Sequence, residues 1–144
     1  MIEEIKSIYI IDSKGNPFFV KELFTQDSEN AEAVLLSNFI AALQTFASEL
    51  GGKQAKIIKL GESKIFTLID NLTKLYFVIK AKRDAKEKKI LDILKKIKNL
   101  FINKFTGHLT DSEENKREIM KEFIPELDEI LEPQDRVQEF LGNL

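Results

Sequence analysis

The chain has 144 residues, of which 43% are hydrophobic and 32% charged, a composition typical of one soluble globular domain with its own core. It contains no cysteine and one histidine, His108, which excludes disulfides, thiolate metal sites, cysteine nucleophiles and multi-histidine metal sites. The net charge of −2 conceals an acidic start (residues 1–52, −5), a basic middle (residues 53–105, +10) and an acidic end (residues 106–144, −7).

The first predicted element is a β-hairpin. Residues 5–11 are rich in isoleucine and tyrosine, which favours a strand, and the turn DSKGNP follows at once. Asp12 can accept backbone hydrogen bonds at the start of this turn, and Gly15 can adopt the left-handed conformation that closes it. Pro17 ends the loop, and Phe18–Leu23 forms the returning strand. We expect the first strand to lie inside a sheet and the second to form an edge.

A helix is predicted next, from Asn30 to Leu50, after the polar connector FTQDSENAE. Its large apolar residues recur at spacings of three and four and form one stripe that can cover a sheet: Leu35, Phe39, Leu43, Phe46 and Leu50. The pair Gly51-Gly52 ends this helix.

Three strands in a meander follow, AKIIKL, SKIFTLID and KLYFVIKA, because the separators GES and DNLT are short turn signals. The third strand is almost continuously apolar from Leu75 to Ile79. Such a run is typical of a central strand that is covered on both faces.

The second predicted helix is capped by Asp84 and reaches Phe105. Its expected buried stripe is Ile90, Leu94, Ile97, Phe101 and Phe105, widened by Ile93 and Leu100. Lysines occupy the opposite face.

The remaining chain predicts three short helical segments. Ser112 can cap one that runs from Glu113 to Ile124. Pro125 is expected to start another, from Glu126 to Leu131, because proline breaks a helix interior. Pro133 begins the last one, which ends near Leu141.

The fold class is therefore α+β, with a five-stranded antiparallel sheet and helices on both faces. Residues 1–107 are expected to form the core, and residues 108–144 a helical extension packed on the same domain.

No pattern in the sequence indicates catalysis. The fragment GGK at residues 51–53 is not a phosphate-binding loop, because Gln54 stands where serine or threonine is required. Most carboxylates lie in polar helical runs, which indicates solvated faces, and His108 lies in a loop where we expect it to be structural or exposed. We predict no catalytic residue, no metal and no cofactor.

The segment AKRDAKEKKILDILKKIKNLFINKF is basic and amphipathic, a pattern found in membrane-surface helices and nucleic-acid-binding helices. If the apolar stripe covers the sheet, only the lysine face is free, and the absence of interleaved aromatic residues disfavours nucleic acid. Two interpretations stay open: a solvated face, or an electrostatic contact with an acidic partner or anionic headgroups. The candidate residues are Lys82, Arg83, Lys86, Lys89 and Lys96.

The layout resembles the longin domain, a SNARE-like or profilin-like fold, and above all the small (sigma) subunits of adaptor complexes. The matching stretches are IKSIYIIDSKGNPFFVKEL, SKIFTLIDNLTKLYFVIKA and ILDILKKIKNLFINKF. The related roadblock proteins usually start with a helix, whereas this chain starts with a strand, and no SNARE heptad region follows. The lysine- and isoleucine-rich composition would suit an archaeal relative of eukaryotic trafficking proteins.

This resemblance implies a non-catalytic interaction module that binds a small GTPase, or that assembles as a homo- or heterodimer or in an adaptor or tethering complex with another longin- or roadblock-like subunit. Because edge strands offer unpaired backbone groups, the candidate contacts lie on the two edges: Phe18, Phe19, Val20, Lys21, Lys56 and Lys59.

Two alternatives are a peripheral binder of anionic membranes, which would use the lysine face of the second long helix, and a small-molecule sensor. The missing cysteines, the lack of an apolar run of membrane-span length and the start MIEEIKS, which is unlike a signal peptide, predict a cytoplasmic location. The first alternative would add peripheral contact with a membrane.

Overall fold

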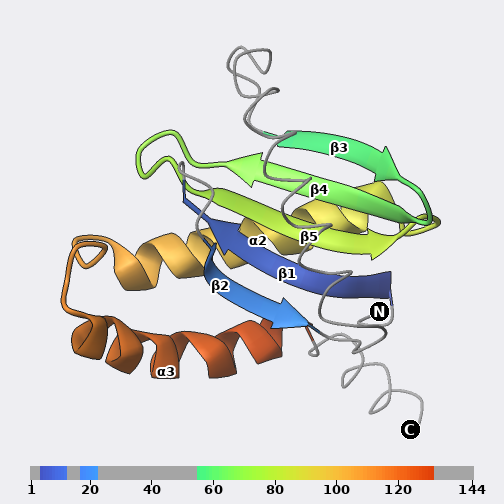
Figure 1. Ribbon diagram of the computed structural model, residues 1–144. Coiled ribbons are helices and arrows are strands. Elements are labelled where there is room, and N and C mark those ends of the chain that lie inside the picture. Colours follow the sequence, from blue (N-terminus) through green and yellow to red (C-terminus); the bar gives the residue numbers. More distant parts are fainter. Residues whose placement is uncertain (1–3, 13–16, 23–54, 132–144) are drawn as a thin grey trace, which may run out of the picture.

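Five strands form one antiparallel sheet in the computed structural model, which describes residues 4–12, 17–22 and 55–131 (Figure 1). The strands are β1 (Ile5–Ile11), β2 (Pro17–Glu22), β3 (Ala55–Leu60), β4 (Ser63–Ile69) and β5 (Tyr76–Lys82). Their order across the sheet is β2-β1-β5-β4-β3, and every neighbouring pair is antiparallel. The predicted fold class and sheet are confirmed.

The order of the strands also confirms which strands are central. β1 lies between β2 and β5, while β2 and β3 form the two edges. β5 is the middle strand, and its residues 77–81 are all buried, as its continuous apolar sequence predicts. β2 begins at Pro17, so this proline belongs to the strand and not to the loop.

Two helices pack on one face of the sheet, α2 (Glu87–Phe105) and α3 (Glu113–Leu131) (Figure 1). The stripe of α2 is buried as predicted, except that Leu100 is only half-buried. It meets alternate side chains of the sheet, among them Ile8, Phe66, Phe77 and Ile79. α3 packs beside α2, so both helices share one core with the sheet.

The opposite face of the sheet carries a second buried cluster: Tyr9, Ile11, Ile65 and Val78. Burial on both faces explains why β1 and β5 carry few polar residues. The helix predicted at residues 30–50, which the sequence assigns to this face, lies outside the described residues. Gly15 of the first turn and the helix predicted after Pro133 also lie outside them.

The predicted start of α2 is wrong. The helix begins at Glu87 after Lys86, and Asp84 does not cap it. The amide of Ala85 donates to the carbonyl of Lys82 (3.0 Å), and the Ala85 side chain is buried in the core. The chain therefore completes a tight turn after β5, which places Ala85 inside, before the helix can begin.

The predicted break at Pro125 is also wrong, because α3 is one continuous helix with Pro125 inside it. Its buried residues, Phe123, Leu127 and Leu131, recur at spacings of four on both sides of the proline. Their packing against the core holds the helix together. The predicted cap is confirmed, since the amide of Asn115 donates to Ser112 Oγ (3.2 Å).

Candidate interaction surfaces

The β2 edge is anchored to the helices by two aromatic rings. Ile10 pairs with Phe19 and Ile11 with Pro17, so Phe18 is an extra residue in β2, a β-bulge. Both rings meet the helix side of the sheet. The ring centroid of Phe18 lies 5.3 Å from that of Phe101, and the ring centroid of Phe19 lies 5.5 Å from that of Phe123.

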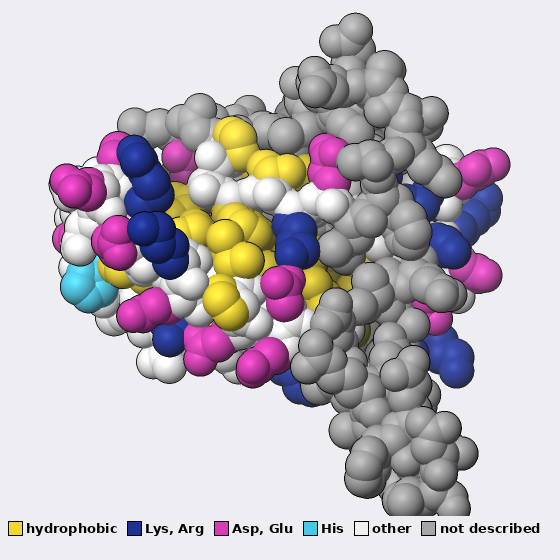
Figure 2. Space-filling model, turned by 90° about the horizontal axis from the view of Figure 1, so that it is seen from below, with side chains coloured by type: hydrophobic (Ala, Val, Ile, Leu, Met, Phe, Trp, Pro, Cys, Tyr) yellow, Lys and Arg dark blue, Asp and Glu magenta, His cyan; other side chains and the backbone are white. Residues whose placement is uncertain are grey.

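Lys21 ties the same strand to α3, because its Nζ lies 2.6 Å from Asp128 Oδ1. The side chains of Phe18, Phe19 and Lys21 thus make contacts within the molecule. What β2 offers a partner is its outer backbone edge and Val20, which is 43% exposed. Seen from below, hydrophobic side chains gather in the middle of the molecule and charged side chains surround them on the left (Figure 2).

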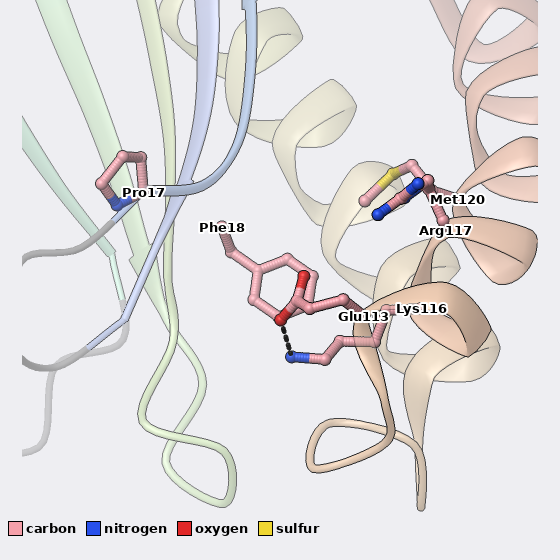
Figure 3. A pocket seen from close by; sticks show the side chains of 6 residues that line it. All are labelled: Pro17, Phe18, Glu113, Lys116, Arg117 and Met120. Atoms are coloured by element: carbon pink, nitrogen blue, oxygen red, sulfur yellow. Dashed lines mark ion pairs between the residues drawn. The ribbon is translucent and has the colours of Figure 1, made fainter.

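A surface hollow of about 260 Å³ lies between the start of β2 and the first turns of α3 (Figure 3). Pro17, Phe18, Glu113, Lys116, Arg117 and Met120 line it. Lys116 Nζ lies 3.3 Å from Glu113 Oε1 and 5.5 Å from the ring centroid of Phe18, an ion pair and a cation–π contact. The hollow therefore offers an aromatic ring, a thioether and Arg117 beside the β2 edge, a combination suited to a side chain of a protein partner.

The β3 edge presents Lys59, which is exposed, and the backbone of Lys56, which pairs with Thr67. The Lys56 side chain lies outside the described part. Exposed lysines on an edge strand discourage pairing with another chain. β2 is therefore the better candidate edge.

The residues of the predicted lysine surface are mostly exposed to solvent. Lys82, Arg83, Lys86 and Lys96 are exposed and Lys89 is half-buried, and the described part of the chain provides no ion-pair partner for any of them. The structure adds two residues that the sequence reasoning did not single out, Lys88 and Lys95. Both line a hollow on α2 of about 390 Å³, together with Lys89, Asp92, Ile93 and Lys96.

Other lysines hold elements together. Lys104 Nζ lies 2.8 Å from Glu126 Oε2, a contact that joins α2 to α3 and raises the pKa of Lys104. Lys64 is buried under the start of α2 and contacts Glu87 Oε2 (3.2 Å). The division between paired and unpaired lysines cannot be read from spacing, because it depends on which elements pack together.

His108 is half-exposed in the turn between α2 and α3, as expected, and it has a partner there. Its Nδ1 lies 2.7 Å from Asp111 Oδ2, and Asn115 also donates to this carboxylate. The hydrogen bond with His108 is the main cause that lowers the pKa of Asp111. These contacts close the turn between two helices, a structural role.

The turn between β4 and β5 is held by Asp70. Its Oδ2 accepts hydrogen bonds from the amide (2.9 Å) and hydroxyl (2.6 Å) of Thr73, and its carbonyl accepts one from the amide of Lys74 (2.8 Å). Burial acts to raise the pKa of Asp70, but the bonds from Thr73 and the charge of Lys98 outweigh it and lower the pKa below the ordinary 3.8.

The Asp70 carboxylate is therefore expected to stabilise the fold only while it is ionised. Replacing Asp70 by asparagine should lower the free energy of unfolding at pH 7 by about 1–2 kcal/mol. A depressed folded-state pKa contributes stability above the unfolded-state value, and this contribution is lost as the pH falls through the folded-state value. Urea unfolding at pH 7 and at pH 2 should show a difference between wild type and variant that shrinks at the lower pH; a constant difference would contradict the role of the charge.

No helix in the described ranges is long and apolar enough to cross a membrane. Nor do residues 4–12, 17–22 and 55–131 bring together three or more side chains that could hold a metal ion.

The sequence matches no protein-family model and no curated protein. Among solved structures, a chain of a homology model of the full-length AP-3 complex is similar over 89% of this chain and 81% of its own length, with a TM-score of 0.61 and 18% identity. MglB, a gliding protein from Thermus thermophilus, matches over 65% and 73% (TM-score 0.45, 20% identity). A roadblock/LC7 domain from Streptomyces avermitilis matches over 69% and 87% (TM-score 0.44, 11% identity). The protein has a longin-like fold, the fold of the AP-3 chain.

Proposed function

We propose that this protein is a non-catalytic interaction module that assembles with another longin- or roadblock-like subunit through the β2 edge. The edge position carries the proposal: Phe18, Phe19 and Lys21 hold β2 in place, Val20 is 43% exposed, and within the described residues no strand pairs with the outer side of β2. Adding a strand to such an edge satisfies backbone groups in a regular array. The AP-3 chain with the same fold is part of a complex, which supports assembly.

Replacing Val20 by lysine is expected to weaken this assembly about tenfold or more, because a charge on an edge strand opposes pairing with another chain. The measurement is co-expression with longin- and roadblock-like proteins of the source cell, followed by size-exclusion chromatography with light scattering. Val20→Thr is the matched control: it keeps the β-branched shape and should leave assembly nearly unchanged. Complexes that tolerate Val20→Lys would exclude β2 as the contact.

A small GTPase is the second candidate partner, which the family resemblance implies. A pull-down with the purified small GTPases of the source cell, each loaded with GDP or with a GTP analogue, distinguishes a GTPase partner from a longin- or roadblock-like subunit. Enrichment in one nucleotide state supports a GTPase partner, whereas no enrichment in either state removes it.

A further inference from the structure

The flank of α2 that faces the β4–β5 turn gathers cations. Lys88, Lys95 and Lys98 are spaced by seven and three residues, so they lie on the same side of the helix. Lys98 Nζ is 3.9 Å from Asp70 Oδ1, which places the turn beside this side. Lys74 is exposed in the turn itself. Lys74, Lys88 and Lys95 have no ion-pair partner within the described ranges.

The positive charge of this region is not cancelled locally. The carboxylate of Glu87 at the start of α2 is already paired with Lys64, which approaches from the sheet. Asp92 is the one carboxylate among the six residues that line the hollow on α2, against four lysines. The surface therefore holds excess positive charge that a polyanionic surface would complement.

Leu72 stands out beside these cations because it is 93% exposed. A single exposed leucine is common on proteins. This one, however, sits in a turn that the hydrogen bonds between Asp70 and Thr73 hold, and that turn presents it to solvent. Moving an exposed apolar side chain from water into an apolar environment lowers the free energy.

We propose that this surface, the basic flank (Leu72, Lys74, Lys88 and Lys95), binds bilayers that contain anionic lipids. The lysines attract the headgroups and Leu72 inserts between them, and peripheral proteins attach stably when two such contributions act together. A nucleic acid fits less well, since no aromatic side chain stands among these lysines to stack on bases. The inference is independent of the β2 edge.

The test is sedimentation of the full chain with phosphatidylcholine vesicles, with and without 30% phosphatidylserine. Binding is expected with the anionic vesicles alone, and it should weaken steeply as salt rises. The double variant K88Q/K95Q should bind about 25-fold more weakly, because each lysine near an anionic surface contributes roughly fivefold. Leu72→Ser should lower binding several-fold and leave the salt dependence unchanged.

The matched control is R117Q/K121Q on α3, which changes the net charge equally and alters two exposed cations outside the flank. It should retain most of the binding. Equal losses in the two double variants would show attraction to net charge alone and overturn the proposal. Failure to sediment with anionic vesicles at low salt, or equal sedimentation with neutral ones, would overturn it as well. Circular dichroism of each variant checks that the fold is intact.

Discussion

Replacing Phe101 by alanine is expected to lower the free energy of unfolding by about 3–5 kcal/mol. Its ring is fully buried and contacts four others: it stacks on Phe105 (centroids 4.4 Å apart, 19°) and meets Phe18, Phe77 and Phe123 edge-on at 5.3–5.6 Å. These rings come from β2, β5, α2 and α3, so one truncation loosens four elements. Because domains of this size are stable by only about 5–15 kcal/mol, much of the stability would be lost.

Urea unfolding followed by circular dichroism measures this loss. Phe101→Leu keeps part of the apolar volume and should give an intermediate loss, whereas Leu72→Ala, at an exposed position, should stay within about 0.5 kcal/mol of wild type. A loss below about 1 kcal/mol for Phe101→Ala would show that the site collapses around the missing ring and that the four elements do not depend on it.

The strands and the α2 stripe were predictable because their signals are local. Alternation of turn signals with isoleucine-rich runs defined β3, β4 and β5 almost to the residue, and spacings of three and four defined the buried face of α2. The start of α2 was not predictable, because Asp84 has a good capping side chain and only the burial of Ala85 delays the helix.

The candidate surfaces were less predictable than the fold. The sequence placed Phe18, Phe19, Val20 and Lys21 together on an edge strand, yet a bulge turns both rings toward the helices and Asp128 engages Lys21. A bulge of one residue leaves no clear mark in the sequence. The turn signal DNLT likewise did not indicate that its leucine, Leu72, would be exposed.

The continuity of α3 through Pro125 leads to a prediction of opposite sign: Pro125→Ala should stabilise the protein. Proline has no amide hydrogen to donate to the carbonyl of Lys121, and its ring crowds that carbonyl. Pro125 is exposed, so alanine removes no core contact. A helix-interior proline costs about 3 kcal/mol relative to alanine, and the freer unfolded chain of the variant returns about 0.4–1 kcal/mol. We expect a net gain of about 2–2.6 kcal/mol, measured by urea unfolding.

Glu129→Ala is the matched control, because Glu129 is exposed on the same helix and its replacement should change stability by no more than about 0.5 kcal/mol. The gain at Pro125 should appear mainly in the midpoint of the transition, with the slope unchanged, since the buried surface stays the same. If Pro125→Ala instead destabilises the protein, the proline sets a bend that α3 needs in order to seat both Phe123 and Leu131 in the core. The stability of α3 would then depend on its shape as well as on its apolar stripe.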